Sequence, residues 1–144
     1  MPDPFGLQRF VDAQADDYDR ALREIRNGRK QSHWMWYIFP QFAGLGMSPT
    51  SQLFAIGSLA EASAYLAHPV LGPRLLECTD AALAHRDRGA LEVFGSPDDM
   101  KLRSSATLFA AVSPAGSAFH RIVDQYFGGD PDQRTLALIA KSSS

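Results

Sequence analysis

The chain has 144 residues, enough for one domain of common size that buries roughly two thirds of the surface exposed by the unfolded chain. Its 14 basic and 16 acidic side chains give a net charge of -2, which argues against broad electrostatic binding to nucleic acid or to anionic membranes. Cys78 is the single cysteine, so an intrachain disulfide and a paired-cysteine metal site are excluded.

The N-terminal segment, residues 1–17, is acidic and lacks the basic and continuous apolar regions of a secretion signal. No stretch of the chain approaches the roughly 18 apolar residues that a membrane-spanning helix needs. Together with the single cysteine, which suits a reducing compartment, these features predict a cytoplasmic protein that does not use a membrane.

The first predicted helix has apolar residues three or four positions apart, from Phe10 through Leu22 to Ile25, and it ends at Gly28. The pattern predicts one long helix, with a break near Asp16 left open.

The segment HWMWYIF, residues 33–39, is too continuously apolar for its period to separate strand from helix, and a helix is slightly favoured. Ser32 is a candidate N-cap for a short helix, and Pro40 must end it. Residues 41–51, QFAGLGMSPTS, combine two glycines, a proline and several hydroxyls, which predicts a loop.

Start and stop signals become clearer after this loop. Ser58 and Glu61 have the spacing of a capping box, and His68 and Pro69 end the helix that they begin. Another helix is predicted over residues 70–85, followed by a short turn before position 95. The side chains expected to be buried in that second helix are Leu71, Leu75, Cys78 and Ala82.

A capping residue followed by proline occurs three times in the last third of the chain, as Ser96-Pro97, Ser113-Pro114 and Asp130-Pro131. These pairs predict three helices, the last two near residues 114–127 and 131–141. The first of them should carry Met100, Leu102, Leu108 and Phe109 toward the core.

The fold class predicted from these elements is all-α, a single compact irregular helical domain over residues 1–141. No alternation of polar and apolar residues is long enough to predict a sheet. The remaining residues, 142–144, are expected to form a disordered tail.

Three motifs carry a resemblance to a known family. They are GRKQSHWMWYIFPQFAGLGMS at 28–48, HPVLGPRL at 68–75 and DMKLRSSATLF at 99–109. The chain resembles an uncharacterised bacterial family, a domain of unknown function with mycobacterial members that genomes often label calpastatin. That label has no support in this sequence, because calpastatin is disordered and this chain is compact and hydrophobic. The resemblance spans about residues 5–138 and implies a small helical fold without an established activity. Ala106 stands where the family usually has methionine.

Six side chains are candidates for a ligand-binding site because they mix aromatic, amide, hydroxyl and cationic groups in the first and third motifs. They are His33, Trp34, Trp36, Gln41, Lys101 and Ser104. Neighbouring residues on a helix or strand face different ways, so we expect at least one tryptophan in the core while His33 and Gln41 approach Lys101 and Ser104 across a partly exposed cleft. His33 as a structural histidine and a core role for most of the aromatic run remain alternatives.

The composition of these motifs suits a planar, phosphorylated ligand such as a nucleotide or ADP-ribose. Arg29 and Lys30 precede the aromatic run, and backbone N–H groups of the loop at Gly44 and Gly46 could bind an anion. The GxG spacing alone is not a dinucleotide fingerprint, and the loop could simply turn. No particular cofactor is indicated.

The alternative function is a protein-interaction module that uses an exposed tryptophan patch. Nucleic-acid binding is disfavoured by the overall charge. Whether the site is enzymatic stays open: Glu61 and Asp99 are the carboxylates near the motifs, but they form no recognisable catalytic pair. The histidines are scattered, which argues against a zinc site.

Overall fold

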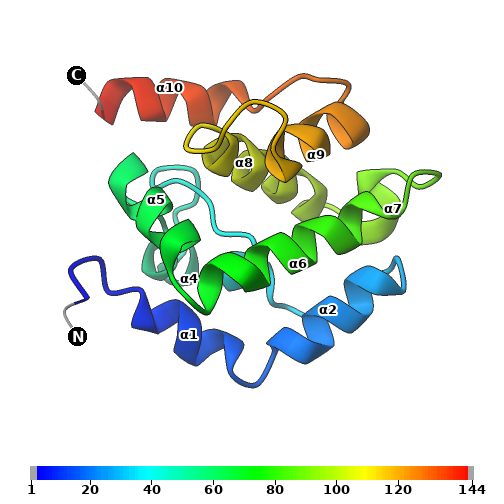
Figure 1. The fold of residues 1–144 in the computed structure, drawn as a ribbon, viewed down its shortest axis with the longest axis horizontal. Helices are drawn as coiled ribbons and strands as arrows, with labels where there is room; N and C mark the ends of the chain where they lie inside the picture. The colour runs from blue at the N-terminus through cyan, green and yellow to red at the C-terminus, as the bar shows by residue number, and fades with distance from the viewer. Residues whose placement is uncertain (1–2, 143–144) are drawn as a thin grey trace.

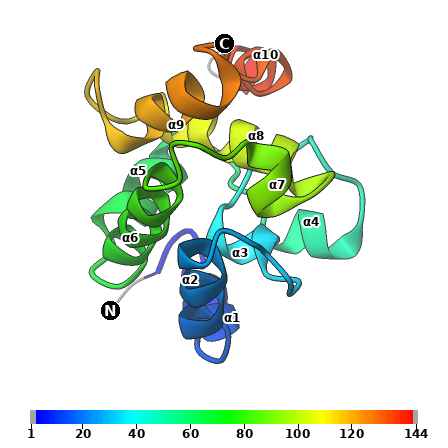
Figure 2. The ribbon, with the colours of Figure 1, turned by 90° about the vertical axis from the view of Figure 1, so that its right-hand side faces the viewer.

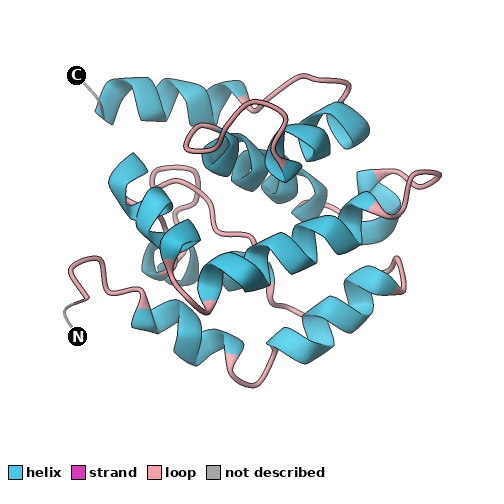
Figure 3. Ribbon diagram, viewed as in Figure 1, coloured by secondary structure: helices cyan, strands magenta, loops and turns pink. Residues whose placement is uncertain are grey.

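The structure, a computed structural model, describes residues 3–142. These residues form ten helices and no β-strand, which confirms the predicted all-α class (Figure 1, Figure 3). The helices are α1 (Gln8–Gln14), α2 (Tyr18–Arg26), α3 (Met35–Ile38), α4 (Pro49–Leu53), α5 (Leu59–Ala67), α6 (Leu71–Leu83), α7 (Ala90–Phe94), α8 (Asp98–Ala110), α9 (Ala118–Phe127) and α10 (Gln133–Ser142). Ser142 of the expected disordered tail lies in α10, and residues 143–144 lie outside the described residues.

The first predicted helix is two helices, because the chain turns between α1 and α2 close to Asp16. Phe10 and Ile25, from the two halves of the apolar pattern, are both fully buried. Gly28 ends the second half with a φ of +77°, a backbone conformation that side chains with a Cβ rarely adopt.

The aromatic stretch contains the predicted short helix, α3, which ends before Pro40. The predicted cap is wrong: Trp34 occupies the N-cap position, and the hydroxyl of Ser32 donates a hydrogen bond to the Glu24 carboxylate instead. The loop that follows is shorter than predicted. Ser48 caps α4 by accepting a hydrogen bond from the Ser51 backbone N–H at 3.1 Å, the same cap-plus-proline signal that marks the later helices.

The capping signal at Ser58 is confirmed, since its hydroxyl accepts the Glu61 backbone N–H at 3.1 Å. The Glu61 carboxylate accepts the N–H of Gly57 at 3.0 Å and not that of the cap residue. The helix ends at His68 as predicted, and the four side chains expected on the buried face of α6 are all buried. They are Leu71, Leu75, Cys78 and Ala82.

The later helix starts are displaced from their predicted positions. Helix α8 begins at Asp98 without a side-chain cap, whereas α9 begins at Ala118. Ser117, not Ser113, caps α9 by accepting the His120 N–H at 3.3 Å. Asp132, not Asp130, accepts the Thr135 N–H at 3.1 Å at the start of α10. In α9 and α10, the residue immediately before the helix provides the cap.

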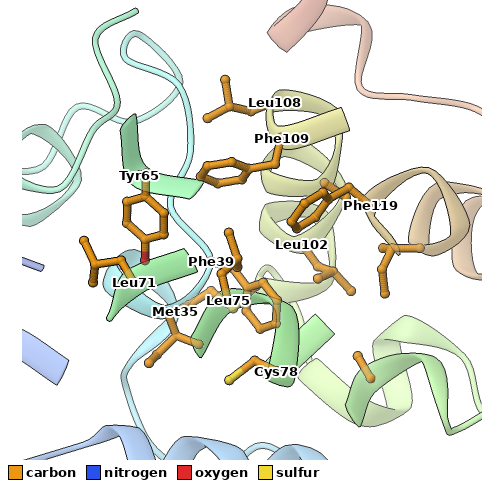
Figure 4. Close-up of a cluster of buried hydrophobic side chains, with 14 of the residues drawn as sticks. Met35, Phe39, Tyr65, Leu71, Leu75, Cys78, Leu102, Leu108, Phe109 and Phe119 are labelled. Atoms are coloured by element: carbon orange, nitrogen blue, oxygen red, sulfur yellow. The ribbon is translucent and has the colours of Figure 1, made fainter. Parts of the chain in front are cut away.

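Helix α8 runs through the interior and contacts α5, α7, α9 and α10 (Figure 2). Every residue from Ser104 to Phe109 is buried, so this helix has no solvent face along that stretch. In the core, the centre of the Phe109 ring lies 5.4 Å from the centre of the Tyr65 ring and 5.6 Å from that of the Phe119 ring. The three rings are shown in Figure 4. Met100 is 46% exposed, so the prediction that it faces the core is wrong.

Candidate functional site

The two tryptophans have separate environments. Trp34 is fully buried, and its indole N–H donates a 2.9 Å hydrogen bond to the Glu24 carboxylate. The prediction that at least one tryptophan is core is therefore confirmed, and Trp34 cannot face a ligand. Trp36 is only partly buried, and its ring lines a cavity. The aromatic run thus contributes one tryptophan to the core and the other to the wall of a cavity.

Glu24 organises the turn that leads into the aromatic run. Its carboxylate accepts hydrogen bonds from the backbone N–H groups of Gln31 and Ser32, at 2.8 and 2.9 Å, and from the Ser32 hydroxyl and the Trp34 indole. Burial acts to raise the pKa of Glu24, but these donors outweigh it and lower the pKa to about 2. The carboxylate is therefore a structural anion that accepts four hydrogen bonds.

His33, the chain neighbour of Trp34, is exposed. Its backbone carbonyl accepts a 3.3 Å hydrogen bond from the Tyr37 hydroxyl, and its side chain lines neither of the cavities described next. His33 therefore shares neither cavity with Lys101 or Ser104. Gln41, by contrast, lies beside Lys101 and Ser104 in one cavity.

Two cavities have residues of the glycine loop in their walls. The smaller, of about 120 Å³, has Trp36, Phe42 and Phe54 in its wall. The larger, of about 240 Å³, has Lys101 and Ser104 in its wall. Both are lined by Gln41, Leu45, Gly46 and Ser51. Since they share these four residues, we describe them together as the Trp36–Lys101 groove.

The groove brings together four of the six predicted residues from separate parts of the chain. Lys101 on α8 places its ammonium 4.5 Å from the centre of the Trp36 ring on α3, a cation–π distance. The same ammonium lies 3.3 Å from the Asp98 carboxylate. Gln41 lines both halves of the groove, and within residues 3–142 its side-chain amide has no hydrogen-bond partner.

A further part of the groove wall comes from α8 and the start of α10. Ser104 lines the groove, but its hydroxyl already contacts the Met100 carbonyl and the Asp132 carboxylate, both at 3.1 Å. Asp132 also accepts the backbone N–H and the hydroxyl of Thr135. Arg134 adds a second cation and donates a 3.3 Å hydrogen bond to the Gly44 carbonyl.

The glycine loop has a defined backbone. Ile56 pairs with its first residues: its N–H donates to the Gln41 carbonyl and its carbonyl accepts the Ala43 N–H, both at 2.9 Å. Gly44 has a φ of +103°, and a Cβ at Gly46 would lie 2.6 Å from the Ser51 side chain. Among the described residues, the backbone N–H groups of positions 44–47 donate no hydrogen bond.

The two carboxylates considered for catalysis lie outside the groove. Glu61 pairs with Arg9 at 2.8 Å and caps the turn at Gly57. Asp99 has one buried carboxylate oxygen without a hydrogen-bond partner among the described residues, but it lines neither cavity. Asp132 is the one carboxylate in the groove wall, and it is already engaged. Within residues 3–142, no group of three or more His, Cys, Asp or Glu side chains could hold a metal ion.

Several groove residues were not predicted from the sequence. Leu45, Pro97 and Met100 supply apolar wall, and Ser51 and Arg134 supply polar groups. The Ser48-Pro49 pair would have predicted α4, and hence the position of Ser51. Nothing local marks Arg134, because it reaches the groove through the packing of α10 on α8.

Comparisons with known proteins agree with this fold. The family model described as "Protein of unknown function (DUF1810)" matches residues 4–139. The chain belongs to the DUF1810 family. The crystal structure of the conserved hypothetical protein Rv1873 from Mycobacterium tuberculosis is similar, with 51% identity and a TM-score of 0.94, over 96% of this chain and 99% of that one. No match is found among curated proteins.

Membership of the DUF1810 family does not indicate an activity, because the function of the family is unknown. The calpastatin label appears in neither comparison. The mycobacterial structure confirms the resemblance that the three sequence motifs indicate. None of the helices within residues 3–142 has the length and hydrophobicity that a membrane span requires. Function must therefore be inferred from the groove.

Proposed function

We propose that the Trp36–Lys101 groove binds a small molecule that combines an aromatic ring with an anionic group, such as a nucleotide or an ADP-ribose-like compound. The observation that supports this most is the meeting of three distant segments around one groove: Trp36 from α3, the glycine loop, and Lys101 from α8. Concave sites with apolar walls and a few convergent polar groups are typical of small-molecule binding.

The aromatic part of the ligand fits the smaller cavity. Trp36, Phe42 and Phe54 offer apolar aromatic surface there, and the Gln41 amide can hydrogen-bond to a ring nitrogen or carbonyl. The loop from Gly44 to Gly46 lines the same cavity. This half of the groove supplies shape and apolar contact.

The anionic part fits the larger cavity. Lys101 and Arg134 both line it, and neither cation is buried. Leu45 and Gly46 also line this cavity, and their backbone N–H groups, which are unpaired among the described residues, are further donors for a phosphate. Charge-assisted hydrogen bonds of this kind are the strong ones.

Binding is supported better than hydrolysis. A hydrolase needs a positioned base to activate water, and Asp132 in the groove wall accepts hydrogen bonds from Ser104 and Thr135. The protein-interaction alternative has less support, because Trp34 is fully buried and the partly buried Trp36 ring is in contact with the Lys101 ammonium. We therefore favour a binding or sensing role.

Thermal-shift measurements test this function. ADP-ribose and ADP should raise the melting temperature, because a ligand at a hundred times its dissociation constant stabilises by about 2.7 kcal/mol. Adenosine and inorganic pyrophosphate, each carrying half of the recognised groups, should stabilise less. Absence of a shift with all four compounds, at millimolar concentration and low salt, would contradict the proposal.

A further inference from the structure

Lys101 is not a free cation in this structure, because it shares a carboxylate with a second lysine. Asp98 lies 2.7 Å from the Lys30 ammonium through one oxygen and 3.3 Å from the Lys101 ammonium through the other. The three side chains carry one net positive charge. How that charge is divided decides how strongly Lys101 can attract an anion.

The two lysines are held to different degrees. The Lys30 side chain is 7% exposed, and its ammonium also lies 5.0 Å from the centre of the buried Trp34 ring. The Lys101 side chain is 23% exposed, and it alone of the two lines the groove. Lys30 is therefore the fixed partner of Asp98, and Lys101 is the one that can turn toward a ligand.

Resting on the proposed function, we infer that Asp98 sets the affinity of the groove for its anionic ligand by holding Lys101 in the unliganded protein. A ligand phosphate takes Lys101 from Asp98, and Asp98 keeps Lys30, so no buried carboxylate is left unpaired. Breaking the longer and more exposed of the two pairs costs little, since partly exposed ion pairs contribute only weakly. Asp98 is thus a residue that weakens binding without touching the ligand.

The inference predicts opposite effects from two substitutions in one ion-pair network. Asp98→Asn removes the competitor of the ligand, so ADP should bind about threefold to fivefold more tightly, the size of a partly exposed ion pair. Lys30→Met leaves Asp98 with Lys101 as its partner, so ADP should bind more weakly by a similar factor. General damage to the site would weaken binding in both variants.

Calorimetric titration of ADP at low salt tests this, with circular dichroism to show that each variant is folded. In a Lys101→Gln background, Asp98→Asn should no longer tighten binding. Equal or weaker binding by Asp98→Asn overturns the inference while leaving the proposed function standing. If Asp98→Asn does not fold, Lys30→Met decides: weaker binding supports the inference, and unchanged or tighter binding overturns it. No binding of ADP or pyrophosphate by the wild-type chain would overturn the proposed function, and this inference with it.

Discussion

The Lys101 ammonium lies 4.5 Å from the centre of the Trp36 ring, although the two residues belong to different motifs of the sequence. This contact joins the aromatic run to the first turns of α8 and forms one side of the groove. Trp34, two positions earlier, points into the core and bonds to Glu24. The neighbouring tryptophans therefore have different roles, which substitutions can separate.

Trp34→Ala should destabilise the protein by about 3–5 kcal/mol, the cost of truncating a large buried aromatic side chain. Trp36→Ala should cost about 1 kcal/mol, because the ring is partly exposed and its contact with Lys101 is worth about 0.5–1 kcal/mol. Urea unfolding of both variants measures the difference. Equal losses of stability would show that Trp36 is also a core residue.

Glu24 should make stability depend on acid pH. Its pKa is about 2 in the folded protein against an ordinary value of 4.5. A depressed carboxyl pKa stabilises the folded state above pH 4.5, and this stabilisation is lost as the pH falls from there toward 2. The shift corresponds to about 3 kcal/mol of unfolding free energy at neutral pH.

Glu24→Gln tests this through urea unfolding at several pH values. The variant should be about 3 kcal/mol less stable than the wild type at pH 7. This difference in unfolding free energy should become smaller as the pH falls from 4.5 to 2. Asp16→Asn, at an exposed position between α1 and α2, is the matched control and should leave the profile unchanged. If the stability difference between Glu24→Gln and the wild type were the same at all pH values, titration of Glu24 would not contribute to the pH dependence of stability.

Gly72 permits the close packing of α6 on the end of α5. A Cβ at this position would lie 2.1 Å from the carbonyl oxygen of Leu66, and backbone cannot easily give way. Gly72→Ala should cost about 3 kcal/mol or more of unfolding free energy. Gly57→Ala, whose Cβ would meet its nearest atom at 3.5 Å, should stay within about 0.5 kcal/mol of the wild type. Similar melting temperatures for the two variants would contradict this packing.

Cys78 should be unreactive in the native protein. Its side chain is buried, and burial raises the pKa of its thiol to about 12, so little thiolate exists at neutral pH. Labelling with a disulfide reagent should be on the order of a hundredfold slower in buffer than in 8 M urea. Rapid labelling of the native chain would show that α6 opens readily.

Local signals predicted most of the helices, because caps and stops act within one turn. Ser58 caps α5, and α3 ends before Pro40, as their residue types predict. The capping signal gives the wrong start where two residues could both serve as the N-cap, as when Ser117 rather than Ser113 caps α9. Helix α4 was missed although Ser48-Pro49 carries the same signal as the later starts.

The site was only partly predictable, because long-range packing decides which side chains share a surface. The polar composition of the motifs pointed correctly to Gln41 and Lys101 as neighbours. It could not show that Trp34 is buried, since its partner Glu24 lies in the preceding helix. Arg134 reaches the groove from the other end of the chain, and its contact with the Gly44 carbonyl depends on how α10 packs.

Isothermal titration of ADP into the wild-type protein and Lys101→Gln, at low salt, tests the binding groove most directly. The wild type should bind one ADP per chain, and Lys101→Gln should bind at least about tenfold more weakly, because a charge-assisted hydrogen bond to phosphate is worth about 1.5–3 kcal/mol. Arg23→Gln, which removes an exposed positive charge on α2, should bind like the wild type. Equal affinity in the wild type and Lys101→Gln would contradict a ligand site between Trp36 and Lys101.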